Sequence, residues 1–417
     1  MLKNFLVKYN KDDSLLRDSL LFFSASMIGN LAGFFYHFYM GRVLGPADYG
    51  VLAAMLSILY IIYVAFNVIQ TSISKFTAEF SAQHNPHKIA YLFIYGLKKL
   101  SIYGIIGLLV YTLGGWIFIA DFAKIPRSTY FLFGILVPFV FILPLSRGIL
   151  QGVQNFKQLS LNLIVEGIVK VVAGITLVYL GLRVNGAVLG IVLSFIAAFA
   201  VAIPALRHYF SVNPQPFPTK EIYKYSLPVS VALFVLTMMY SVDVILVRRF
   251  FDDVTAGYYA SASMLGKVVF FATLAITTVM FPKVVALREA NKTHSHILKK
   301  SLILVGAIVA VALFFNTLFP RFVITVFFGS SYLRITNLLW IFTLTFSLFS
   351  FIYLLSMYHL SMNRGKFVFF LVFSLIAEVA IISFFHTSLE EVALALCTMM
   401  AVLFLFLLVY TFYHGRH

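Results

Sequence analysis

The chain has 417 residues, of which 61% are hydrophobic and 11% are charged, and its mean hydropathy is +0.97. Soluble globular domains contain about 45–50% apolar and about 25% charged residues, so this composition excludes a soluble protein and predicts one embedded in lipid. The net charge of +16 fits either a nucleic-acid binder or a membrane protein with basic loops. A single cysteine, Cys397, excludes an internal disulfide and a thiolate-rich metal site.

About twelve apolar stretches follow one another along the chain, each long enough for an α-helix to cross a hydrocarbon core of about 30 Å. The first is longer than the core of a signal peptide and follows acidic residues, so we expect it to be retained. The predicted transmembrane helices are 16–41, 50–76, 92–119, 128–150, 158–182, 185–207, 223–248, 256–282, 300–319, 332–360, 366–386 and 390–413.

Lysine and arginine are unevenly divided between the two sides of the predicted membrane. The loops on the side of the N-terminus hold most of them, whereas the acidic loop residues are evenly divided. By the positive-inside rule, this asymmetry predicts a multi-pass protein of the cytoplasmic (inner) membrane with both termini in the cytoplasm. The basic excess therefore indicates topology and anionic lipid headgroups, and no nucleic-acid partner is expected.

Residues in the first half of the chain recur in the second half at one constant separation in sequence. Arg42 and Gly50, at the first predicted external turn, correspond to Arg249 and Gly257. Six predicted helices in each half give both copies the same orientation, the pattern of parallel repeats in transporters. We therefore predict an all-α polytopic membrane protein with two pseudo-symmetric six-helix lobes around a central cavity.

A proline-rich segment at 211–219 separates the two halves, and its alternating prolines favour an extended, semi-rigid connector. The predicted organisation is an N-terminal lobe at 1–210, this linker, and a C-terminal lobe at 220–417. The predicted loops are short and contain no GxxxxGK[ST] motif, so we expect neither a soluble catalytic domain nor ATP hydrolysis by this chain.

Five ionisable residues lie well inside predicted helices, where each costs about 2.5–3.5 kcal/mol on insertion scales and should face a partner or water. Glu166 and Lys170 are four residues apart on one helix, so they form either an intrahelical pair or a site where Lys170 meets an anionic headgroup. Asp243 and Lys267 form either a structural pair or a substrate- or ion-coupling site. Glu378 is either a buried, protonated acid or a coupling site.

Four arginines lie near predicted helix ends: Arg42, Arg248 and Arg249 outside, and Arg147 on the cytoplasmic side. Arginine at a helix end reaches lipid phosphates, and the alternative is bidentate contact with a substrate diphosphate. The candidate substrate-binding residues are Lys170, Lys267, Arg147, Arg42 and Arg249. The candidate ion-coupling or charge-pair residues are Glu166, Asp243 and Glu378.

Three stretches resemble the polysaccharide and oligosaccharide-lipid flippases of the multidrug/oligosaccharidyl-lipid/polysaccharide exporter superfamily. They are the external turn Gly41–Gly50, the cytoplasmic turn Arg147–Lys157, and Glu166–Lys170 with the glycines that follow it. The resemblance implies a twelve-helix flippase that moves a polyprenyl-linked saccharide from the cytoplasmic to the outer leaflet. The chain differs from the lipid II flippases of that superfamily, because its first two helices have no arginine deep in the membrane and only Lys267 matches their cavity cations.

The sequence thus predicts a protein without enzymatic activity, metal or cofactor that carries a polyprenyl-(di)phosphate-linked oligosaccharide or polysaccharide repeat unit by alternating access. Its expected partners are this substrate, the bilayer, and the glycosyltransferases and polymerase of the same pathway. One alternative is a cation-coupled multidrug exporter of the same superfamily, with Asp243 and Glu378 as Na⁺ or H⁺ sites. A membrane-embedded enzyme acting on lipid-linked sugars is the weaker alternative, because external acids occur only in short turns.

Overall fold

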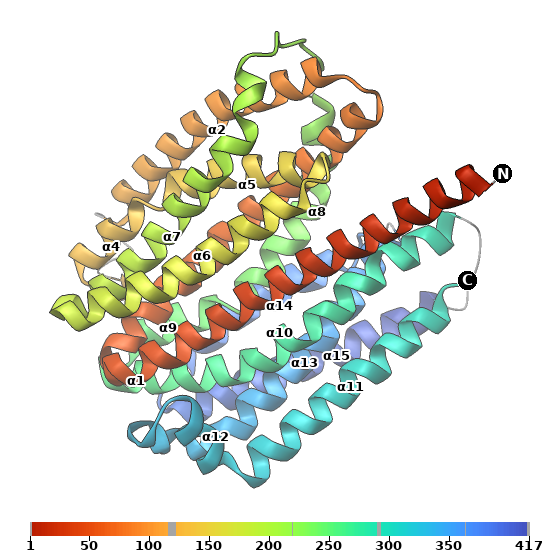
Figure 1. The fold of residues 1–417 in the computed structure, drawn as a ribbon. Helices are drawn as coiled ribbons and strands as arrows, with labels where there is room; N and C mark the ends of the chain where they lie inside the picture. The colour runs from red at the N-terminus through yellow and green to blue at the C-terminus, as the bar shows by residue number, and fades with distance from the viewer. Residues whose placement is uncertain (1, 116–121, 219, 290–292, 363, 415–417) are drawn as a thin grey trace. The chain divides into compact units, whose positions relative to one another are not determined.

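The computed structural model describes residues 2–115, 122–218, 220–289, 293–362 and 364–414. Within these ranges the regular secondary structure is helical and no strand occurs (Figure 1). Because helices satisfy every backbone polar group within one segment, they suit a chain whose side chains are mostly apolar. The predicted all-α polytopic fold is confirmed.

The main helices, in chain order, are α1 (Leu2–Ala82), α2 (Pro86–Gly114), α4 (Arg127–Gly134), α5 (Val137–Gly152), α6 (Phe156–Leu177), α7 (Arg183–Leu206), α8 (Lys220–Met239), α9 (Val242–Phe250), α10 (Asp253–Glu289), α11 (Ser295–Leu318), α12 (Pro320–Phe327), α13 (Thr336–Ser361), α14 (Val368–Phe384) and α15 (Leu389–His414). Shorter helical segments are Val178–Leu182, Arg207–Phe210 and Ser330–Ile335.

Nine helical segments of the described residues are long and apolar enough to cross a membrane. Two of them, Ser24–Ala82 and Phe156–Phe210, have 59 and 55 residues and contain a break. The breaks fall at Gly45 (φ 72°) and Gly181 (φ 88°), where glycine adopts a left-handed conformation. Gly45 lies in the predicted turn between the helices 16–41 and 50–76, and Gly181 lies one residue before the predicted end of the helix 158–182. Counting each broken segment as two crossings and adding the shorter apolar helix Val368–Phe384 reproduces the twelve predicted helices.

Two of the predicted helices are interrupted. The predicted helix 128–150 consists of α4 and α5, and Pro138 lies in the first turn of α5, where a missing N–H is tolerated. The predicted helix 223–248 consists of α8 and α9, which are separated at Tyr240 and Ser241. No glycine or proline lies at this second break, so local sequence does not reveal it.

The described chain divides into two compact units. Unit 1 contains the residues up to Met40 together with Ile62–Ser230, and unit 2 contains Gly41–Ile61 together with the residues from Val231 onward. The segment Gly41–Ile61 therefore packs with helices from the second half of the sequence. The predicted boundaries of the two lobes and the central cavity stay predictions.

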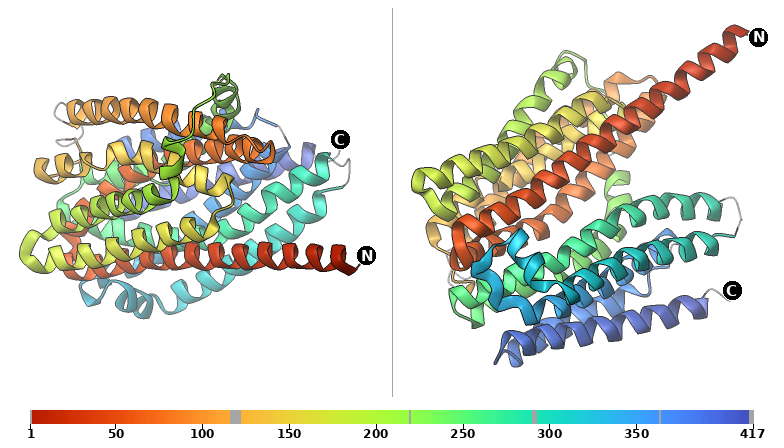
Figure 2. Two further views of the ribbon diagram at one scale, coloured as in Figure 1. Left: turned by 45° about the horizontal axis from the view of Figure 1, so that its top comes forward. Right: turned by 60° about the horizontal axis from the view of Figure 1, so that its bottom comes forward.

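In unit 1, α6 and α7 form an antiparallel pair and lie side by side in Figures 1 and 2. Glycines allow this close approach, because a Cβ atom on Gly190 would lie 2.5 Å from the Cα atom of Gly174. A Cβ atom on Gly186 would similarly lie 2.7 Å from the backbone of Leu177. The tight pair positions the polar face of α6 against α5 and against the part of α1 that belongs to unit 1.

In unit 2, α13 packs against α10, α11 and α15. The two glycines that the sequence repeat pairs, Gly50 and Gly257, lie against each other in this unit. A Cβ atom on Gly50 would lie 3.1 Å from the Cα atom of Gly257, and one on Gly257 would lie 1.8 Å from the carbonyl oxygen of Pro46. Larger side chains at these positions would therefore separate the turn Gly41–Gly50 from α10.

The proline-rich linker is extended over its described part, which ends at residue 218, as its prolines favour. It is attached to unit 1: the backbone N–H of Gln215 donates to the carbonyl of His87 at 3.0 Å. The ring of Phe217 packs edge-on against that of Phe80, with 4.7 Å between centroids.

Candidate functional site

Arg147 lies at the centre of a buried polar cluster in unit 1. Its side chain is 2% exposed; its Nε–H donates to Asn162 Oδ1 at 2.7 Å, and its guanidinium forms an ion pair with the carboxylate of Glu166. One of the two interpretations of Arg147, contact with lipid phosphates at a helix end, does not fit this burial, and its role in substrate binding stays a prediction. The α6 side chains that face α5 supply the oxygen atoms that compensate this buried charge.

Lys170 follows on the same face of α6, because Asn162, Glu166 and Lys170 are spaced four residues apart. The Glu166 carboxylate pairs with Arg147 and not, as one reading of the sequence had it, with Lys170. The Lys170 ammonium lies 5.9 Å from the ring centroid of Tyr36, a cation–π arrangement. Among the described residues, no carboxylate lies within ion-pair distance of it.

A second buried polar cluster lies in unit 2 around Asp243, in the first turn of α9. One carboxylate oxygen lies 3.7 Å from the Lys267 ammonium. The other accepts hydrogen bonds from the hydroxyls of Tyr259 at 3.2 Å and Ser263 at 3.1 Å. Asp243 and Lys267 are 2% and 3% exposed, so the structure contains the pair that one of the two readings of these residues predicts.

Glu378 on α14 lies near this pair. Its side chain is fully buried, and neither carboxyl oxygen has a hydrogen-bond partner. The charges of Asp243 and Lys267 both act on it. Among the described residues, no three His, Cys, Asp or Glu side chains are grouped so that they could hold a metal ion.

The sequence repeat relates the two clusters. Tyr36 and Asp243 occupy equivalent repeat positions, and Lys170 and Glu378 are equivalent to within one position. In each half, the fifth predicted helix therefore carries an ionisable residue near the first helix, next to Tyr36 in one half and Asp243 in the other. This residue is a lysine in unit 1 and a glutamate in unit 2.

The arginines near the predicted external helix ends have partners outside these two clusters. Arg42 donates to the carbonyl of Thr325 at 2.8 Å, near the C-terminus of α12, where a cation is favourable. Arg249 is exposed in the last turn of α9. Arg248 is 1% exposed and pairs with Asp253 at 3.0 Å. The predicted lipid contact of Arg248 is therefore wrong, because this side chain folds inward to the start of α10.

Asp252 fixes the turn that carries this pair. Its carboxylate accepts the backbone N–H groups of Val254 and Thr255, each at 3.0 Å, and so caps the start of α10. Hydrogen bonds from Thr255 hold the pKa of Asp252 below its usual value. The cap keeps the first turn of α10 in place, where Asp253 meets Arg248.

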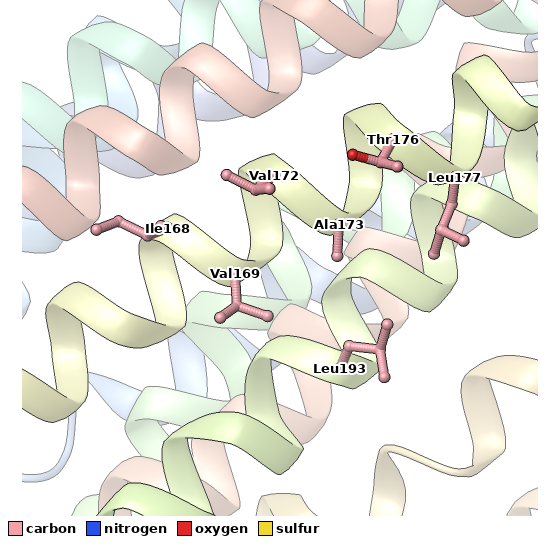
Figure 3. A pocket seen from close by; sticks show the side chains of 7 residues that line it. All are labelled: Ile168, Val169, Val172, Ala173, Thr176, Leu177 and Leu193. Atoms are coloured by element: carbon pink, nitrogen blue, oxygen red, sulfur yellow. The ribbon is translucent and has the colours of Figure 1, made fainter.

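An apolar depression of about 370 Å³ lies on the surface of unit 1 between α6 and α7 (Figure 3). Ile168 and Val172 on its wall are 53% and 58% exposed, and Thr176 is its only polar lining residue. A surface of this kind suits hydrocarbon chains and offers nothing to a charged headgroup. The depression is therefore not a candidate for the polar site.

Sequence analysis missed the uncharged members of both clusters. Asn162 precedes Glu166 by four residues, and Tyr259 and Ser263 precede Lys267 by eight and four. Polar residues at this spacing share one helix face. Polar residues four positions from a charged residue could therefore have revealed the uncharged members of both clusters from the sequence.

Residues 15–287 match the family model described as polysaccharide biosynthesis protein. The match covers more than half of the chain. The chain belongs to the polysaccharide biosynthesis protein family.

Two curated relatives of this family member are the uncharacterized membrane protein MJ1375 of Methanocaldococcus jannaschii and the stage V sporulation protein B of Bacillus subtilis. The first is 24% identical over 69% of this chain and 72% of its own length. The second is 22% identical over 64% of this chain and 55% of its own length.

Solved structures show the same fold. An inward-facing multidrug resistance MATE family transporter of the MOP superfamily aligns with a TM-score of 0.77 and 14% identity, over 95% of this chain and 99% of that one. A MOP superfamily transporter from Pyrococcus furiosus aligns with a TM-score of 0.67 and 15% identity, over 94% and 93%. The family member is thus a multi-pass membrane protein with the fold of MOP-superfamily transporters, as the sequence resemblance implies.

Proposed function

We propose that this protein is a flippase that carries a polyprenyl-(di)phosphate-linked oligosaccharide or polysaccharide repeat unit across the cytoplasmic membrane by alternating access, without covalent chemistry. The cationic group Lys170 receives the phosphate of the substrate. Outward movement of negative charge across an inside-negative membrane releases about 2.3 kcal/mol per charge per 100 mV, so the membrane potential favours export.

The observation that supports this proposal is the state of Lys170 in unit 1. It lies inside a predicted transmembrane helix beside Tyr36, while the nearby acid, Glu166, is paired with Arg147. An ammonium group inside lipid needs an anionic or polar partner. Among the described residues no carboxylate pairs with it, and the phosphate of a lipid-linked sugar has the required charge.

The direct test is a flipping assay in proteoliposomes with a fluorescent polyprenyl-phosphate-linked saccharide. A charge-assisted hydrogen bond contributes about 1.5–3 kcal/mol, so we expect Lys170→Ala to slow flipping roughly 10- to 100-fold and Lys170→Arg to retain most of the rate. Lys98→Ala, which removes an exposed lysine of α2, is the control and should transport normally. Equal rates for Lys170→Ala and wild type would remove Lys170 from the mechanism.

A cation-coupled multidrug exporter is the second candidate function. Two MOP-superfamily structures with this fold are described as multidrug resistance MATE family transporters, and Asp243 and Glu378 are buried acids in unit 2. Export of lipophilic cationic dyes that depends on both acids, with no movement of the saccharide lipid, would favour this function over the flippase.

The membrane orientation and the pathway partners that we propose follow from the same function. Both termini lie in the cytoplasm, and the saccharide lipid comes from glycosyltransferases and passes to a polymerase of the same pathway. The chain itself is not an enzyme in this proposal. A purified preparation that modifies a lipid-linked sugar, with loss of that activity on mutation of an external acid, would contradict it.

A further inference from the structure

The break between α8 and α9 places an acid at the start of a half-helix. The chain leaves helical geometry at Tyr240 and Ser241, and α9 begins at Val242 with Asp243 in its first turn. A carboxylate is favourable at this end of a helix, where backbone N–H groups point outward. The start of α9 therefore stabilises a negative charge at Asp243.

Asp243 is also compensated by side chains from α10. Lys267 supplies a positive charge at 3.7 Å, and Tyr259 and Ser263 donate hydrogen bonds to the second oxygen. These three residues lie four positions apart on one face of α10. The ammonium group of Lys267 thus occupies the place beside the carboxylate where a free metal cation would otherwise bind. Because this ammonium group belongs to a side chain of the protein, it cannot leave the site as a free ion can.

Glu378 has no such compensation. Both of its carboxyl oxygens are buried without a donor, and its helix packs against α9 and α15. Among the described residues, the titratable groups whose charges act with it are Asp243 on α9, and Lys267 and Tyr259 on α10. The one cation of this group is already paired with Asp243.

Charge balance then decides the state of Glu378. Asp243 and Lys267 together are neutral, so an ionised Glu378 would leave one uncompensated negative charge inside a membrane helix bundle. With a proton on Glu378, the three residues are neutral. Loss of that proton to water creates the negative charge, which requires water entry or a shift of a neighbouring helix to stabilise it.

We propose that Glu378 carries an exchangeable proton in unit 2 and that Lys267 is the permanent counter-cation of Asp243, so that this unit exchanges protons and does not bind Na⁺. In unit 1, Lys170 lies within one position of the repeat equivalent of Glu378, so one repeat carries an anion site and the other a proton site. The coupling of proton exchange to saccharide movement rests on the proposed function, whereas the proton site itself does not.

The first experiment measures protonated carboxyl groups by infrared spectroscopy of the purified full-length protein in lipid nanodiscs at neutral pH. We expect Glu378→Gln to lose one protonated-carboxyl signal relative to wild type, and saturating Na⁺ to leave the wild-type signal unchanged. Glu390→Gln, which alters an exposed acid at the start of α15, is the matched control and should lose none. An unchanged signal in Glu378→Gln, or its removal by Na⁺, would overturn the proposal.

A second variant keeps the test decisive if Glu378→Gln folds poorly. Lys267→Gln removes the counter-cation, so Asp243 should then take up a proton and add one protonated-carboxyl signal. The same spectrum as wild type would show that Lys267 does not hold Asp243 in its ionised form, and the proposal would fail.

Transport measurements separate this inference from the proposed function. In proteoliposomes, a pH gradient should change the wild-type flipping rate and leave the Glu378→Gln rate unaffected. If Glu378→Gln loses the infrared signal but wild type moves no saccharide, the proton site is supported and the flippase is rejected. If wild type and Glu378→Gln move the saccharide with the same response to the pH gradient, the flippase is supported and Glu378 is rejected as its coupling group.

Discussion

Individual charged residues in this protein differ in how completely they are compensated. Arg147 has an amide oxygen and a carboxylate as partners, and Asp243 has an ammonium and two hydroxyls. Lys170 and Glu378, at matching positions of the repeat, lack a partner of opposite charge within bonding distance among the described residues. Function is expected at these incompletely compensated residues, since structural stability alone would favour apolar side chains there.

The Arg147–Glu166 pair makes a prediction about stability. Removing one partner of a buried ion pair costs about 3–5 kcal/mol, because the other charge stays buried and unpaired. We expect Arg147→Gln to lower the stability of the purified protein by this order in thermal or denaturant unfolding in nanodiscs. The double variant Arg147→Gln/Glu166→Gln should recover part of that loss.

A cycle of the two single variants and the double variant measures the coupling. If the single losses simply add in the double variant, the two side chains do not act as a pair and the geometry of unit 1 described above is incorrect.

At the scale of elements, glycines determine how closely the helices approach. The contact between Gly257 on α10 and the turn at Pro46 leaves no space for a side chain. In a helix interior, alanine is otherwise favoured over glycine by about 1 kcal/mol. The same substitution should therefore have opposite effects at a packed and an open helical position.

We expect Gly257→Ala to destabilise the protein by about 1–3 kcal/mol or more, since the added methyl group would lie 1.8 Å from the Pro46 carbonyl oxygen. Gly306→Ala on α11 is the matched control, because the nearest atom to its methyl group would be Phe351 at 3.9 Å. Thermal unfolding of both variants checks this. A Gly257→Ala variant as stable as Gly306→Ala would contradict the close contact.

At the scale of the whole molecule, the distribution of basic residues predicts on which side of the membrane each loop lies. The chain has one cysteine, so Cys397→Ser provides a background without thiols. Gln83 and Ser330 are exposed residues in loops predicted to lie on opposite sides of the membrane. Single cysteines at these positions can therefore report the orientation directly.

In intact cells, a membrane-impermeant maleimide should label Ser330→Cys and should label Gln83→Cys only after the membrane is opened. The physical reason is the attraction of basic loops to the cytoplasmic side. The reverse labelling pattern would place the termini outside and would reverse the direction of transport proposed above.

The number and position of the transmembrane helices could be predicted from the sequence, because the transfer of apolar side chains into lipid adds up along each segment and needs no knowledge of neighbours. The turns at Gly45 and Gly181 were predictable for a similar reason, since each ends a long apolar stretch. The five charged residues inside helices were also visible as exceptions to the apolar pattern.

Only the tertiary structure decided which partners these charges have. Sequence spacing suggested Lys170 as the partner of Glu166, but the orientation of α6 against α5 brings Arg147 to that carboxylate. The break before Asp243 has no local signal. Partner choice depends on which faces of distant helices meet, and that is set by packing over the whole unit, whereas insertion into lipid is set by each segment on its own.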